Sequence, residues 1–187
     1  MALVALIAFT SAAHGGLING SINFSSGPGG GVVLQDSLGN DTTNLLAVTG
    51  IKSWLFAEVE EGTGSFDGVP DGSAVTFAQP WVFNPSTPKT PLWSIAGPDN
   101  FAFNLLTATV VRQSGSFLAI KGTGTLTSTN YSATAGTWYF TTQGDEAEGK
   151  FSWSSSTAAV PDAGTTLALL GGSLLGLCGL RRKLRPQ

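Results

Sequence analysis

The chain has 187 residues and a formal net charge of −3, and hydrophobic residues make up 42% of it. Before Asp162, five basic residues stand against eleven acidic ones, so this part carries a net charge near −6. That acidic balance excludes the electrostatic footprint of a nucleic-acid-binding protein. Cys178 is the single cysteine, so the chain has no pair for an internal disulfide.

The amino end has the pattern of a secretory signal peptide. Residues 2–9 are apolar, and Ser11 and Ala13 place small residues at the −3 and −1 positions of a cleavage site before His14. We therefore expect a signal peptide over residues 1–13. A basic segment ahead of the apolar run is missing, so either the true start lies upstream or the signal is minimal. The alternative is that these residues form a first β-strand.

The composition and pattern of residues 14–159 indicate one exported, all-β domain. These residues are rich in Gly, Ser, Thr and aromatic residues, and they alternate apolar and polar positions without a sustained helical period. Turn signals separate roughly nine to eleven short strands, which favours a sandwich or jelly-roll-like fold. The apolar runs cover residues 17–24, 32–34, 45–49, 53–59, 73–78, 81–83, 92–96, 101–111, 117–128 and 137–142, and a last strand contains Phe151 and Trp153.

Catalytic chemistry has little support in the sequence. His14 is the only histidine and lies at the predicted mature terminus, so a Ser-His-Asp triad and a histidine metal set are not expected. Glu58 and Glu60 are two residues apart, and a regular strand would place them on one face about 7 Å apart. That spacing suits general acid–base work on a glycoside, although a solvated strand end has the same pattern. We expect no catalytic residues, no cofactor and no enzyme activity.

A calcium site is the remaining metal hypothesis. Asp67 and Asp71 lie in the segment DGVPDG, where carboxylates alternate with turn residues. The segment lacks the full twelve-residue ligand pattern of a calcium loop. A plain Asp-Gly turn explains it equally, and we expect no metal.

Five tryptophans are a high count for a small β-domain. Trp54, Trp93, Trp138 and Trp153 lie in alternating strands, which favours a place in the core. Trp81 follows Pro80 and precedes a proline-rich segment, so we expect it to be exposed. An exposed indole can stack on a sugar ring, and Trp81 is therefore the candidate for carbohydrate contact.

The last twenty-eight residues have three distinct parts. Residues 160–164 read VPDAG, residues 165–180 form an uncharged apolar run, and residues 181–187 are basic. The run would span roughly 24 Å as a helix, against a hydrocarbon core of ~30 Å, and snorkelling basic side chains close most of the difference. We expect a transmembrane helix with a cytoplasmic C-terminus. The alternative, a buried helix of a globular core, fits its four glycines poorly.

This three-part tail resembles the PEP-CTERM class of sorting signals, and most closely the VPDSG-CTERM variant. The resemblance implies that an exosortase, a membrane-embedded processing enzyme, reads the sorting motif and removes the tail. Ala163 replaces the serine of the named variant, and both residues are small. Carried onto this sequence, the motif is Val160, Pro161, Asp162, Ala163 and Gly164, and the cytoplasmic stop is Arg181, Arg182, Lys183 and Arg185.

We therefore expect a secreted cell-surface or extracellular-matrix protein that is held transiently in the inner membrane. Its partner would be the exosortase, and the resemblance adds exopolysaccharide as a second partner. One alternative is a polysaccharide-binding module that uses surface tryptophans. A glycoside-active domain that uses Glu58 and Glu60 is the other.

Overall fold

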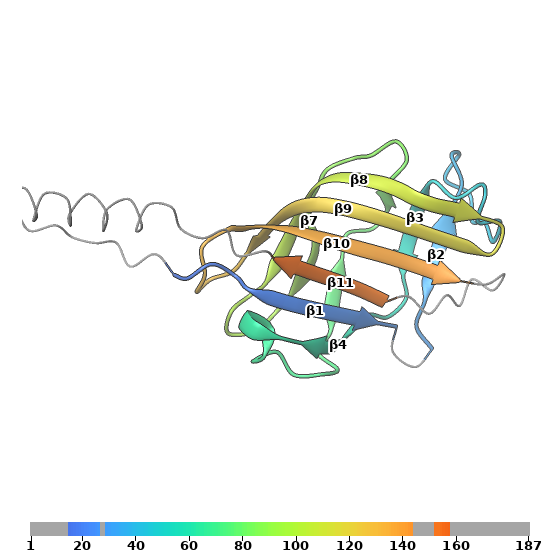
Figure 1. The fold of residues 1–187 in the computed structure, drawn as a ribbon. Coiled ribbons are helices and arrows are strands. Elements are labelled where there is room, and N and C mark those ends of the chain that lie inside the picture. Colours follow the sequence, from blue (N-terminus) through green and yellow to red (C-terminus); the bar gives the residue numbers. More distant parts are fainter. Residues whose placement is uncertain (1–14, 27–28, 144–151, 158–187) are drawn as a thin grey trace, which may run out of the picture.

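The structure is a computed structural model that describes residues 15–26, 29–143 and 152–157. These residues contain eleven strands and one 3-10 turn, which confirms the prediction of an all-β domain (Figure 1). The strands are β1 (Gly20–Ser25), β2 (Val32–Gln35), β3 (Gly50–Trp54), β4 (Glu58–Gly62), β5 (Val75–Phe77), β6 (Trp81–Val82), β7 (Lys89–Ile95), β8 (Ala102–Ser114), β9 (Phe117–Thr127), β10 (Thr134–Gln143) and β11 (Ser152–Thr157), and the turn η1 covers Gly64–Phe66.

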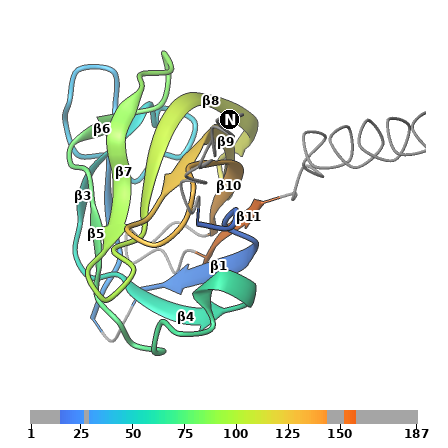
Figure 2. The same ribbon diagram turned by 90° about the vertical axis from the view of Figure 1, so that its left-hand side faces the viewer.

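The described strands form two sheets of unequal size. The larger has the order β4-β1-β11-β10-β9-β8-β7-β5, and the smaller has the order β2-β3-β6. Figure 2 shows β3 and β6 on the opposite side of the molecule from β8, β9 and β10. The strands β7 to β11 follow one another as an antiparallel meander, which differs from the double Greek key of a jelly roll.

The alternation of residues explains why the large sheet has one buried face. On β9, every second residue from Leu118 to Leu126 is buried, with glycines at positions 122 and 124, and the residues between them face outward. The longer β8 breaks this alternation at two bulges, next to Leu106 and next to Val111. Both of these apolar side chains are exposed, because a bulge adds a residue without a partner across the ladder.

Aromatic side chains join the two sheets across a common core. The rings of Trp81 on β6 and Trp138 on β10 have centroids 5.3 Å apart. Within the large sheet, the Phe24 ring on β1 and the Trp93 ring on β7 also meet edge to face, at 5.0 Å. Such pairs add about 0.5–1.5 kcal/mol each beyond the burial of their area. The fold therefore depends on aromatic packing.

Strand β11 completes the large sheet, and it brings the two described ends of the chain close together. It lies between β1 and β10, and Thr157 at its end pairs with Gly20 at the start of β1. Figure 1 shows the start of β1 and the end of β11 at the same end of the molecule. The chain therefore enters and leaves the described domain at one end.

Most predicted strands are confirmed, but two runs are wrong. Residues 45–47 form a turn between β2 and β3. The run 53–59 spans the end of β3, a connection and the start of β4, and both Leu55 and Phe56 in that connection are exposed. Within the described residues, no helix has the length and hydropathy needed to cross a bilayer. The predicted signal peptide and the predicted span over residues 165–180 lie outside those residues.

Candidate functional site

Trp81 is fully buried, so the prediction that it is exposed to carbohydrate is wrong. On β6, Trp81 lies opposite Ile51 of β3, which is also fully buried, so the two side chains share the inward face of the small sheet. There the ring contacts Phe83, with centroids 5.4 Å apart, as well as Trp138. The neighbouring proline marks a chain reversal but does not decide which face of a two-residue strand is buried.

The other described tryptophans also serve the core. Trp93 and Trp138 are fully buried, as predicted. Trp54 is half-buried, stacks on Phe77 at 4.3 Å and donates a hydrogen bond from Nε1 to the Ala78 carbonyl at 3.1 Å. The side chain of Trp153 lies outside the described structure. None of the tryptophans with described side chains forms an exposed aromatic row.

Glu58 and Glu60 lie on β4, but the strand is not regular between them. Val59 pairs with Phe24 and Glu61 pairs with Asn23, so Glu60 is the extra residue of a β-bulge. The inward–outward alternation of side chains is therefore interrupted at Glu60. The spacing of two residues no longer implies that Glu58 and Glu60 lie on the same face of the strand about 7 Å apart.

Asp67 and Asp71 are both exposed in the connection between η1 and β5. The connection is held by its own backbone, because Val69 N–H donates to the Phe66 carbonyl at 2.9 Å and Gly72 N–H donates to the Val59 carbonyl at 2.8 Å. In the described part of the chain, no group of three or more His, Cys, Asp or Glu side chains could hold a metal ion. Among the described residues, the fold therefore brings no group of acidic, histidine or cysteine side chains together with Asp67 and Asp71 that would support the calcium hypothesis.

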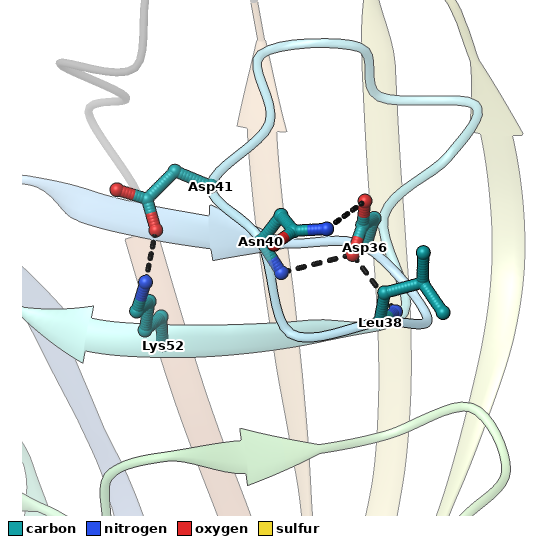
Figure 3. Close-up of polar contacts among 5 residues, drawn as sticks. All are labelled: Asp36, Leu38, Asn40, Asp41 and Lys52. Carbon is teal, nitrogen blue, oxygen red and sulfur yellow. Dashed lines mark hydrogen bonds and ion pairs between the residues drawn. The ribbon is translucent and has the colours of Figure 1, made fainter.

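The turn after β2 carries a set of hydrogen bonds centred on the carboxylate of Asp36 (Figure 3). Asp36 Oδ1 accepts hydrogen bonds from the N–H groups of Leu38 at 2.8 Å and Asn40 at 2.9 Å, and Oδ2 accepts one from Asn40 Nδ2 at 3.4 Å. These donors, first among them the Asn40 backbone, hold the pKa of Asp36 below its ordinary value. The sequence predicts a turn at residues 36–41, but it does not show which donors the carboxylate receives.

The turn carries two further exposed groups. Leu38 is 83% exposed at its tip. Asp41 accepts from Lys52 Nζ at 2.5 Å, and both side chains are about half exposed or more (Figure 3). An ion pair in such contact with water contributes little to stability, typically about 0–1 kcal/mol. The turn is therefore held by the Asp36 hydrogen bonds.

The outer face of the large sheet carries a row of hydroxyl groups. Thr107, Thr123 and Thr137 lie opposite one another on β8, β9 and β10, and the Oγ1 atoms of Thr107 and Thr123 are 2.7 Å apart. Ser21 on β1 lies in the same register, two strands beyond Thr137, and its Oγ lies 2.9 Å from Thr63 Oγ1. We call this set the hydroxyl row. Its neighbouring threonines lie one strand apart, at about 4.8 Å.

Beside the hydroxyl row lies the exposed aromatic ring of Tyr139 on β10. Tyr139 is 42% exposed, and Lys121 Nζ lies 5.4 Å from its ring centroid. A cation above an aromatic ring is attracted by the ring quadrupole, by about 0.5–1 kcal/mol at an exposed site. The outer face thus combines neutral hydroxyls with one aromatic ring and one cation. This face is not among the sites predicted from the sequence, although the alternating threonines of residues 123–127 are a visible signal for it.

Comparison with known protein families identifies a motif in the C-terminal tail. Residues 159–184 match a family model described as the VPDSG-CTERM motif. The chain therefore ends in a C-terminal sorting signal of the PEP-CTERM-like kind, and the signal is specifically the VPDSG-CTERM motif. Neither curated proteins nor solved structures give a match to the chain.

Proposed function

We propose that the chain is an exported surface protein whose function depends on processing at its C-terminal tail by an exosortase. The observation that supports this proposal is the match of residues 159–184 to the VPDSG-CTERM motif. Pro161, Asp162 and Gly164 would be read by the enzyme, and the chain would be cut near them. In this reaction the protein is the substrate, and we propose no catalytic activity of its own.

The proposed topology follows from the charge pattern of the tail. Residues 165–180 carry no charge, and Arg181, Arg182, Lys183 and Arg185 follow directly. The positive-inside rule then places the basic end in the cytoplasm. The β-domain and the sorting motif would lie across the inner membrane, after export directed by residues 1–13. Processing would release the domain to the cell surface or the extracellular matrix.

The described domain is compatible with a short attachment at one end. Thr157 pairs with Gly20, so the chain leaves the domain beside its point of entry. The tail would therefore hold the domain by this end, and the opposite end, with the β8–β9 hairpin at Gly115, would face away from the membrane.

The experiment is to replace Asp162 with alanine and follow the intact mass of the protein in cells that contain the exosortase. We expect the wild-type chain to lose the mass of its basic end and Asp162→Ala to keep it. Asp71→Ala is the matched control, because Asp71 is an exposed aspartate in a turn and lies about ninety residues before the motif in the sequence. Equal cutting of all three chains would contradict a sorting role for the motif.

A second candidate is the binding of a neutral polysaccharide at the outer face of the large sheet. The observation that favours it is the hydroxyl row next to Tyr139, since sugars are bound by hydrogen-bonding groups together with an aromatic ring. An extended polysaccharide has a repeat similar to the spacing of strands, so successive sugars can meet successive hydroxyls. In this proposal the polysaccharide contacts the hydroxyl row and Tyr139 instead of Trp81, which is buried.

The test is retention of the protein on the exopolysaccharide of the producing cells, measured by affinity electrophoresis. We expect Tyr139→Ala and Thr123→Lys each to weaken retention about fivefold or more, because they remove the ring or place a bulky charge in the row. Thr76→Lys is the matched control, because Thr76 is an exposed strand threonine on β5. Equal retention of all variants would exclude this face as the binding surface.

A further inference from the structure

β11 lies in the middle of the large sheet although it is the last described strand of the chain. It pairs with β1 from Gly20 to Phe24 and with β10 from Thr137 to Thr141. Its backbone is therefore hydrogen-bonded along both sides, unlike that of an edge strand. Without β11, the strands β4 and β1 would be separated from the five strands beyond it.

The end of β11 lies almost at the sorting motif. The strand ends at Thr157, and only Ala158 and Ala159 separate it from Val160. Enzymes that cut peptide bonds hold their substrate as an extended segment through its backbone. An enzyme that needs more than two residues ahead of the motif must take them from β11. The same backbone groups would then be required by the enzyme and by the sheet.

We propose that the insertion of β11 into the sheet limits processing at the adjacent motif. The inference depends on the proposed function, in which an exosortase cuts there. The cut breaks one peptide bond. Its carbonyl carbon passes to the nucleophile of the enzyme, and the new amino group leaves on the tail with the proton that the nucleophile gives up. Water then attacks the acyl-enzyme, which returns the proton to the nucleophile and leaves a carboxylate at the new C-terminus of the domain. Folding and processing compete because β11 cannot pair with β1 and β10 while the enzyme holds its end.

The topology also sets the order of events during export. Gly20 pairs with Thr157, so the pairing of β1 with β11 closes a loop that contains nearly the whole domain. This closure must wait until the C-terminal strand has crossed the membrane. The backbone of β11 is free for the enzyme until the strand is inserted, and afterwards it is free only when the end of the strand opens locally. Processing is therefore fastest before the sheet is complete.

The experiment is a pulse-chase measurement of cutting in cells that contain the exosortase. The test variant has a Gly-Ser linker of about six residues between Ala158 and Ala159, which moves the motif up to roughly 20 Å from the sheet. We expect it to be cut at least about threefold faster than the wild-type chain. The matched control has the same linker after Gly29, an exposed residue with open space around it, and should be cut at the wild-type rate.

A second variant acts on β11 directly. Ser154 pairs with both Asn23 and Tyr139, and Ser154→Pro removes a backbone N–H in the middle of this central strand. We expect it to be cut at least as fast as the linker variant, whether or not its domain folds, when cut and uncut chains are counted in the same sample. Slower cutting than wild type would overturn the inference.

The outcomes separate the inference from the proposed function. If the wild-type chain is cut and the linker after Ala158 leaves the rate unchanged or lowers it, β11 does not limit processing, while the sorting function stands. If no variant is cut in the presence of the exosortase, both proposals fail. Faster cutting by the Ala158 linker together with an unchanged rate for the Gly29 linker supports both.

Discussion

Gly122 on β9 lies directly opposite Trp138 on β10, and the indole ring occupies the space above the glycine. A Cβ atom added to Gly122 would lie 1.7 Å from Nε1 of that ring. Gly124 makes similar room for Phe103, whose Cζ atom would lie 2.7 Å from an added Cβ. The Gly-Thr-Gly segment thus combines outward threonine with inward glycines that accommodate large rings.

Gly122→Ala should therefore destabilise the domain. The methyl group forces the buried Trp138 ring to move, and overpacking of this kind costs about 1–3 kcal/mol or more of the free energy of unfolding. The measurement is the urea midpoint of unfolding. Gly115→Ala is the control: it lies in the β8–β9 hairpin with open space around an added Cβ, and it should change the free energy of unfolding by about 0.5 kcal/mol or less. Equal shifts in the two variants would contradict the packing role of Gly122.

Asp36 predicts a pH dependence of stability. Hydrogen bonds from the Asn40 and Leu38 N–H groups hold its folded-state pKa below the ordinary value. The charged form therefore favours the folded state. This contribution is fully present above the ordinary pKa of aspartate and is lost as the pH falls through the lower folded-state value. The pKa itself can be measured by NMR titration of the Asp36 carboxyl carbon.

The variant Asp36→Asn tests, by unfolding experiments, whether the charged form of Asp36 stabilises the folded state. Asparagine keeps an oxygen acceptor for the turn, but it does not titrate. We expect the variant to be less stable than the wild-type protein near pH 7, and the difference to shrink as the pH is lowered toward about 3. A difference that grows toward low pH would show that the carboxylate opposes folding.

Gln113 on β8 should hold the turn that precedes β3. Its Nε2 donates to the carbonyls of Leu45 at 2.6 Å and Val48 at 2.9 Å. Gln113→Leu removes both donors, and loss of the partners of such carbonyls costs about 1–3 kcal/mol. We expect faster hydrogen exchange of the Ala47 and Thr49 amides, with unchanged exchange in β9 and β10. Uniformly faster exchange would instead indicate global destabilisation.

The ion pair between Lys52 and Asp41 should matter little. Both side chains are well exposed to solvent, so water and salt screen their attraction. Lys52→Gln is expected to change the free energy of unfolding by about 0.5 kcal/mol or less, as measured by urea unfolding at low salt. A larger loss that disappears at about 1 M salt would show that the pair stabilises the turn.

Periodicity in the sequence predicts the strands well where one face is continuously buried. Phe101, Phe103 and Leu105 alternate on the core side as expected, and so do Trp138 and Phe140. Alternation fails where the ladder is irregular. The bulge at Glu60 and the break after Trp54 depend on pairing with distant strands, which a local pattern does not contain.

Trp81 shows the same limit for the candidate site. The prolines after it indicate a loop only as far as Pro88, because Pro91 lies within β7. The burial of Trp81 comes from β3 and from Trp138, which are far away in the sequence. The hydroxyl row has a similar origin, because register brings Thr107, Thr123 and Thr137 together. The tail is different. Its signal is linear, so the sequence alone was sufficient to predict the VPDSG-CTERM resemblance that the family model confirms.

The central claim is that the tail is a processed sorting signal. The most direct measurement is the intact mass of the protein from native cell envelopes, with and without the exosortase. We predict a mature species that begins near His14 and ends near Gly164 and that is absent when the enzyme is absent. A chain that still carries Arg181 to Arg185 in both strains would contradict this account and would make the tail an ordinary membrane anchor.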